Sequence, residues 1–178
     1  MYINEHCDPL FVILVIRLYM QTASAKEIKI ALEQRSAREL IAICMRLARF
    51  KKENKELLTY LLFAGADEAD YIVQVQELID EQFAAINRQN WYHIKKGMRK
   101  ILTEVRKYCR YSPHKSTEVT LRLYYCQRML EFTPSIRRNR VLRGVFERQV
   151  STIRTAIGKL HEDLQYDFNQ ELDDLLAR

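Results

Sequence analysis

The stretch from Trp91 to Tyr111 has the clearest pattern in the chain and most constrains its fold. At about 100° per residue, its apolar side chains gather in one arc of a helical wheel. This apolar arc consists of Trp91, Ile94, Met98, Ile101, Leu102, Val105, Tyr108 and Cys109. The basic side chains form a second arc, which consists of Lys95, Lys96, Arg99, Lys100, Arg106, Lys107 and Arg110. The pattern predicts a helix with one face for a protein core and another for something negatively charged.

Residues that form turns are scarce, because the whole chain of 178 residues has 4 Gly and 3 Pro. A chain of this length suits one domain with a substantial core. So few glycines and prolines leave little material for the turns of a many-stranded sheet. We therefore expect an all-α fold, an irregular helical bundle or an α–α superhelix of about six to seven helices. The single all-helical domain is expected to span residues 23–178.

Local signals mark several helix ends before residue 91. Ser36 and Glu39 have the spacing of a capping box, which predicts a helix from there through Phe50. The next helix, residues 55–64, is apolar almost all round and is expected to be the most buried one. Gly65 suits its C-terminal end. Acidic residues at 67–70 then suit the N-terminus of a helix that runs to about Asn87.

The C-terminal part has a long apolar periodicity. Thr133 and Pro134 have the pattern of a helix start, and apolar residues recur from there to Leu175 without a proline. This pattern predicts one long C-terminal helix of about 40 residues, roughly 60 Å in length. Gly144 or Gly158 could instead split or bend it.

The first residues differ from the rest. The apolar run from Leu10 to Ile16 ends at Arg17, far short of a membrane span. A signal peptide is one alternative, because residues 23–25 (Ala-Ser-Ala) have the form of a cleavage site. The segment before the run has no Lys or Arg, however, and carries Glu5 and Asp8. We therefore expect residues 1–22 to be an N-terminal extension of a cytoplasmic protein, with no membrane association.

Motifs for catalysis, cofactors and metals are missing from the sequence. It contains no GxSxG, Walker loop, GxGxxG or HExxH. Cys109, His114 and Cys126 are the nearest approach to a metal site, but their spacing matches no compact zinc motif and a fourth ligand is missing. We expect no enzyme, no catalytic residue, no cofactor, no metal and no small-molecule substrate. Cysteines without CxxC spacing favour a reducing compartment.

Charge is distributed very unevenly. Residues 86–160 contain 18 Lys and Arg against 4 Asp and Glu, whereas residues 161–178 contain 1 against 6. Such a basic block can bind nucleic acid without sequence preference. Four tyrosines among the cations could stack on bases: Tyr92, Tyr111, Tyr124 and Tyr125. No nucleic-acid-binding module is recognisable, so this remains the alternative.

The preferred interpretation is a module for protein–protein interaction or a scaffold. Its partner would be an acidic protein or a second copy of the chain, bound through the basic arc of residues 91–111 and the arginines that follow it, Arg137, Arg138 and Arg140. The acidic side of residues 67–87 and the acidic segment 162–174 could instead cover the basic stretches within the molecule.

Three stretches give the chain a resemblance to a group of uncharacterised all-helical bacterial proteins. These stretches are KKENKELLTYLLF (51–63), IKKGMRKILTEVRKY (94–108) and LHEDLQYDF (160–168). The resemblance covers about residues 24–170. It implies an all-α cytoplasmic protein, and it implies no activity and no site residues.

Overall fold

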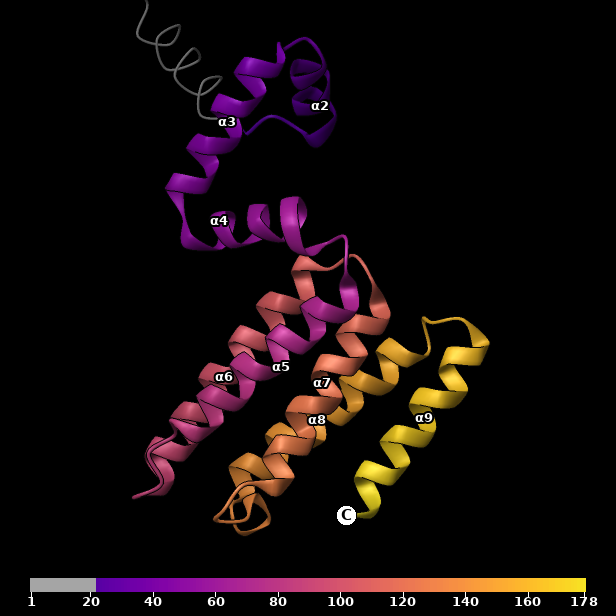
Figure 1. The fold of residues 1–178 in the computed structure, drawn as a ribbon. Coiled ribbons are helices and arrows are strands. Elements are labelled where there is room, and N and C mark those ends of the chain that lie inside the picture. Colours follow the sequence, from indigo (N-terminus) through magenta and orange to yellow (C-terminus); the bar gives the residue numbers. More distant parts are fainter. Residues whose placement is uncertain (1–21) are drawn as a thin grey trace, which may run out of the picture. The chain divides into compact units, whose positions relative to one another are not determined.

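The computed structural model describes residues 22–178, and Figure 1 shows that this part of the chain is helical throughout, without strands. The all-α prediction is therefore confirmed for these residues. The backbone divides into two units, one that ends at Lys51 and one that spans Lys52–Arg178. The predicted extension at residues 1–22 lies outside the described residues, except for its last residue. Among the described helices, none combines the length and the apolar character that a membrane span requires.

Two helices form the described part of the first unit, α2 (Ala25–Glu33) and α3 (Ala37–Phe50). Each begins with a capping box, in which a serine hydroxyl accepts from a backbone N–H and a glutamate accepts from the backbone of that serine. Ser36 pairs with Glu39 in α3, as the sequence predicts, and Ser24 pairs with Glu27 in α2, a capping box that was not predicted. Neither helix contains a buried residue. Both are therefore defined by local hydrogen bonds rather than by a core.

The second unit starts with α4 (Lys52–Thr59), which continues as a π-helical turn, η1 (Tyr60–Ala64). Gly65 ends the turn as predicted, because its N–H donates to the Tyr60 carbonyl at 2.7 Å. The expectation that this helix is the most buried one is wrong. Tyr60 is buried and packs edge-on against Tyr71, but Leu61, Leu62 and Phe63 are 62–76% exposed. An apolar sequence indicates which residues can be buried, but not whether other helices cover them. The helices of this unit cover Tyr60 and leave Leu61, Leu62 and Phe63 exposed.

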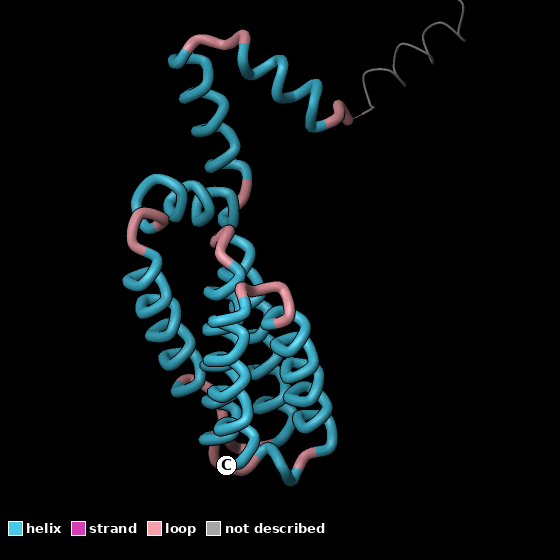
Figure 2. The backbone as a smooth tube through the Cα atoms, turned by 90° about the vertical axis from the view of Figure 1, so that its right-hand side faces the viewer, coloured by secondary structure: helices cyan, strands magenta, loops and turns pink. Residues whose placement is uncertain are grey.

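Five helices then pack side by side as a bundle, as Figures 1 and 2 show. They are α5 (Glu68–Ala84), α6 (Trp91–Tyr111), α7 (Lys115–Glu131), α8 (Arg140–Ile157) and α9 (Glu162–Ala177). α7 lies at the centre and contacts α5, α6, α8 and α9. Its fully buried apolar residues accordingly point to more than one side: Val119, Leu121, Tyr125, Cys126 and Met129.

α6 has the bounds that the sequence predicts, and Asn90 caps it by accepting from the His93 N–H at 3.0 Å. The apolar arc faces the core as predicted. Six of its residues are buried, and Trp91 and Tyr108 are half-buried against the same core. The packed inner side of α6 therefore makes the helix a rigid support for the side chains on its outer side.

The long C-terminal helix is not formed. A 3₁₀ turn, η2 (Ile136–Arg138), follows Pro134, and α8 begins only after Asn139, whose side chain accepts from the N–H groups of Val141 and Leu142. α8 ends at Ile157 and α9 begins at Glu162, so the chain breaks at Gly158, as the alternative interpretation allows. Glycine is a poor helix former. The break lets α9 turn back along α7 and α8 and bury Leu172 and Leu175.

Candidate functional site

Six of the predicted basic residues make up the outer side of α6, which we call the cationic face. Five are exposed and Lys95 is half-buried. In residues 22–178 no carboxylate forms an ion pair with any of them, so this part of the chain leaves their charges uncompensated. From Lys95 to Arg110 the face runs roughly 22 Å along the helix at 1.5 Å per residue. Its members are Lys95, Lys96, Arg99, Lys100, Arg106 and Arg110.

Several acidic residues of the bundle are paired or placed away from the cationic face. Asp80 on α5 binds Arg128 of α7 at 2.8 Å and accepts from the Tyr124 hydroxyl at 2.8 Å. Glu131 binds Arg128 at 2.7 Å and Arg178 at 3.7 Å. α9, which carries most of the acidic segment 162–174, contacts α7 and α8. Within the described part of the chain, acidic side chains therefore do not cover the cationic face.

Lys107 belongs to the predicted basic surface but is buried, with 7% of the residue exposed. Its Nζ lies 2.7 Å from Glu56 of α4 and also pairs with Glu104. The Tyr111 hydroxyl donates to the same Glu56 carboxylate at 2.9 Å. Burial alone would lower the pKa of Lys107, but the hydrogen bonds to Glu104 and Glu56 outweigh it and raise the pKa well above its usual range. The ion pairs of Lys107 therefore link α4 to α6, and its charge is not available to a binding partner.

Arg137, Arg138 and Arg140 lie in η2 and at the start of α8, and all three are exposed. α6 starts at the end of the bundle where α7 and α8 are joined, as Figure 1 shows. A cation–π contact links the two connections there, with the Arg88 guanidinium 4.9 Å from the Phe132 ring centroid. These arginines are thus at the same end as Lys95 and Lys96, whereas Arg110 is at the opposite end.

The four tyrosines that could stack on bases are mostly committed to the fold. Tyr111 and Tyr125 are buried, and the Tyr125 hydroxyl donates to the Met98 carbonyl at 2.9 Å. Tyr124 is half-buried and donates to Asp80. Burial and the nearby Asp80 raise the pKa of Tyr124 to about 12. Only Tyr92 of the four, with 65% exposure, presents its ring beside the cationic face.

Two of the free cysteines, Cys109 and Cys126, are embedded in the core. Burial raises the pKa of Cys109 and that of Cys126 to about 12, so both remain protonated thiols at neutral pH. In residues 22–178 no group of three or more His, Cys, Asp or Glu side chains could hold a metal ion. His114, the third candidate ligand, is the N-cap residue of α7 and is exposed.

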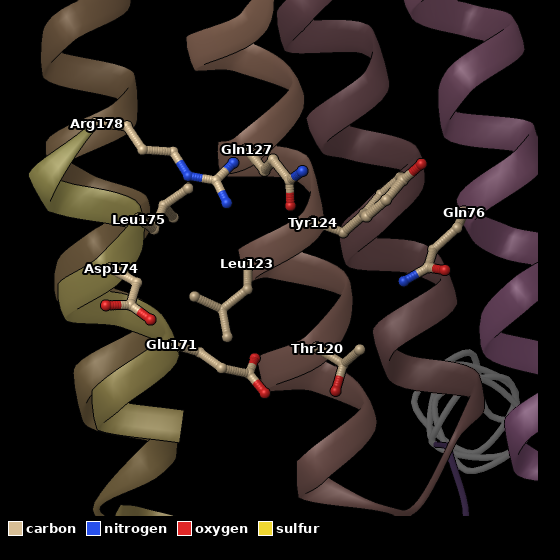
Figure 3. Close-up of a pocket in the computed structure, with 9 residues that line it drawn as sticks. All are labelled: Gln76, Thr120, Leu123, Tyr124, Gln127, Glu171, Asp174, Leu175 and Arg178. Carbon is tan, nitrogen blue, oxygen red and sulfur yellow. The ribbon is translucent and has the colours of Figure 1, made fainter. Parts of the chain in front are cut away.

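A hollow of about 250 Å³ lies between α5, α7 and α9 (Figure 3). Its α9 wall carries Glu171 and Asp174, and Figure 3 shows Leu123 of α7 between these carboxylates and the rest of the wall. The Tyr124 hydroxyl points away from the hollow toward its partner Asp80. The hollow therefore has mixed charge and no activated nucleophile among the side chains in Figure 3.

Arg122 of α7 is a basic residue that the sequence prediction did not select. It is 8% exposed, and its guanidinium binds Glu118 at 2.9 Å and the Gln149 amide oxygen at 2.8 Å. The spacing of Glu118 and Arg122, four residues apart on a helix, is the only sequence signal for this pair. Gln149 could not be assigned to it from sequence because it lies on α8.

Comparison with protein-family models, with curated protein sequences and with solved structures finds no match for this chain. The resemblance to a bacterial family therefore stays an expectation. Any proposal about function therefore rests on the geometry of the described residues alone.

Proposed function

We propose that the protein is a non-enzymatic interaction module that binds an acidic protein partner through the cationic face of α6. The observation that carries the proposal is that the six basic side chains of this face have no ion pair within the described residues, while the opposite side of the same helix is buried in the core. The interaction surface is therefore held on a rigid element.

Uncompensated like charges on one helix repel one another, and an oppositely charged partner removes that cost. Such a surface also increases the rate of encounter with an acidic partner and fixes its orientation. Arg137, Arg138 and Arg140 extend the positive charge at one end of the bundle. We include them in the proposed surface as residues at its border.

Two observations favour a protein partner over nucleic acid. Base stacking needs accessible aromatic rings, and of the four tyrosines considered only Tyr92 is mostly exposed. The second unit also exposes a short apolar row on η1, which suits protein surfaces better than phosphates. That row consists of Leu61, Leu62 and Phe63. Nucleic-acid binding through phosphates remains the second candidate, because the cationic face is long enough to follow a phosphate backbone.

We place this function in a reducing, cytoplasmic compartment. Cys44, Cys109 and Cys126 are free thiols, and two of them are buried where they serve as small apolar residues.

Salt-titrated binding to an unrelated duplex DNA and an unrelated single-stranded RNA tests the choice of partner. We expect fluorescence anisotropy to show no more than weak binding at low salt and no binding at about 150 mM salt. The reason is that the surface provides few contacts to nucleic acid other than ionic ones, which salt weakens. Binding that persists at that salt concentration would contradict the proposal. A log–log salt slope steeper than about −4, reduced when Lys96, Arg99 and Lys100 are all changed to Glu, would establish the nucleic-acid alternative instead.

A further inference from the structure

The C-terminal half of α6 and the N-terminal half of α7 line a second cavity, of about 680 Å³, which is open to the surface. Four cationic side chains line it, two from each helix: Arg106, Arg110, Lys115 and Arg122. Thr103 adds a hydroxyl to the same wall. This cavity is therefore a concentrated positive site at one end of the cationic face.

One carboxylate, Glu118, is among the lining residues, and it is already neutralised. Arg122 donates to it from Nε at 3.0 Å and lies 2.9 Å away through Nη2, and Lys115 lies 3.4 Å away. Burial raises the pKa of Glu118, but the hydrogen bond and charge of Arg122 outweigh it and hold that pKa below its usual range. Glu118 therefore stays ionised and orients Arg122 and Lys115, but it cannot also balance the other cations.

Arg106 and Arg110 supply the unbalanced charge. They are separated by one helical turn on α6, both are exposed, and neither has an ion pair with any described residue. Their guanidinium groups can each present two parallel N–H donors to an oxyanion. Like charges one turn apart repel each other unless an anion lies between them.

The backbone adds to the positive potential. α7 is 17 residues long, and its N-cap residue, His114, provides no side-chain hydrogen bond to the first turn. The N-terminal end of a helix carries a partial positive charge that favours an anion nearby. Lys115, the first residue of α7, lines the cavity, so the cavity lies at this end of the helix.

We propose that this cavity binds a phosphoryl group, with Arg106 and Arg110 as its principal ligands and Arg122 as a fixed cation behind them. A phosphate dianion has enough charge and enough acceptor oxygens for two guanidinium forks, whereas a single carboxylate can satisfy one. The group is carried by a phosphorylated side chain or is a free phosphate ion. The carrier in the first case is the acidic protein partner, so that part of the inference depends on the proposed function. Binding of the phosphoryl group itself does not.

Isothermal titration of the full chain with inorganic phosphate and with O-phosphoserine tests the cavity, and unphosphorylated serine serves as the reference ligand. We expect both phosphate probes to bind and serine not to bind. Tighter binding of O-phosphoserine would assign the group to a phosphorylated side chain, and equal or tighter binding of inorganic phosphate would assign it to the free ion.

The paired variant R106Q/R110Q should weaken binding of the phosphate probes at least about tenfold, because it removes charge-assisted hydrogen bonds. The matched control is R154Q/K159Q, which removes the same charge from exposed positions outside both the cavity and the cationic face. We expect the control to remain within about twofold of wild type, since distant exposed charges are screened by salt. All four changed side chains are outside the core, so we expect both variants to unfold at the wild-type temperature. That result would show that both are folded.

No heat of binding from either phosphate probe at millimolar concentrations, or an equal loss of binding in both variants, would overturn the cavity assignment. The result is independent of the proposed function. A chain that binds phosphate but captures no protein would refute only the proposed function, whereas capture without phosphate binding would refute only the cavity.

Discussion

Replacing Tyr125 by alanine is expected to lower the free energy of unfolding by about 4 kcal/mol, the loss typical of a fully buried aromatic ring. Tyr125 lies on the central helix α7 and is 0% exposed. Its ring packs against Phe83 of α5 with the ring centroids 5.7 Å apart, and its hydroxyl donates to Met98 of α6. The ring therefore joins three helices, and its removal leaves a cavity where they meet.

The variant Tyr125→Phe is the matched control, because it keeps the ring and removes only the hydroxyl. We expect it to cost about 1 kcal/mol, the net worth of one buried hydrogen bond. Urea denaturation followed by circular dichroism measures both losses. A loss for Tyr125→Ala no larger than that for Tyr125→Phe would show that α7 is not at the centre of the core.

Glu68 is expected to be sensitive to substitution, although it is a charged residue in the first turn of α5. Its carboxylate accepts hydrogen bonds from the Tyr60 hydroxyl at 2.8 Å and from the Ser112 and Thr117 hydroxyls. Tyr60, Ser112 and Thr117 are all buried. The carboxylate thus ties η1, the α6–α7 connection and α7 to the start of α5. Glu68→Ala is expected to lower the free energy of unfolding by about 3 kcal/mol, because buried hydroxyl groups lose their acceptor.

The dependence on pH gives an independent test of Glu68. Burial raises the pKa of Glu68, but the hydrogen bonds from Ser112, Thr117 and Tyr60 outweigh it and hold the pKa below its usual range. A carboxyl with a lower pKa in the folded state stabilises the fold at pH values above its unfolded pKa. That contribution is lost as the pH falls through the folded pKa.

Wild type should therefore lose more stability than Glu68→Gln between pH 6 and about pH 3, because the amide does not titrate. Glu56 and Glu118 also have lowered pKa values, but they are present in both proteins and cancel in the difference. Chemical denaturation at each pH measures the effect, with the exposed Glu162→Gln as the control. Equal acid sensitivity in wild type and Glu68→Gln would contradict the hydrogen-bond network.

The sequence predicted the fold well where an apolar pattern and the residues that start or end a helix indicated the same bounds. α6 has an apolar arc, a capping asparagine at Asn90 and a proline at Pro113 after its end, and its bounds are as predicted. The capping box of Ser36 and Glu39 likewise fixes the start of α3, because its hydrogen bonds span only three residues.

Where it failed, the outcome depended on contacts between distant segments. The apolar character of Leu61 to Phe63 does not reveal whether another helix covers them, and they are exposed. The apolar residues of α7 point to several sides, and only the packing of four neighbouring helices shows that it is central. The break at Gly158 depends on whether α9 gains more by burying Leu172 and Leu175 than by continuing α8.

The candidate site shows the same division. Periodicity correctly predicts which basic residues of α6 face away from its apolar arc, because they follow from the helix alone. It cannot predict that Glu56 of α4 reaches Lys107 and buries it. It also cannot place Arg122 beside Arg106 and Arg110, because that cavity requires the crossing of α6 and α7.

The most direct test of the central claim is quantitative capture of protein partners from an extract of the source cells. The triple variant with Lys96, Arg99 and Lys100 changed to Glu reverses the middle of the cationic face. The control triple has the same change in charge at exposed basic residues elsewhere, Lys26, Arg154 and Lys159. Neither set includes Lys107, whose loss would disturb the fold.

We expect wild type and the control triple to capture the same defined protein. The cationic-face triple should capture at least about tenfold less of it, since reversed charges at an interface repel an acidic partner. Capture of that protein by all three chains to the same extent would contradict the account.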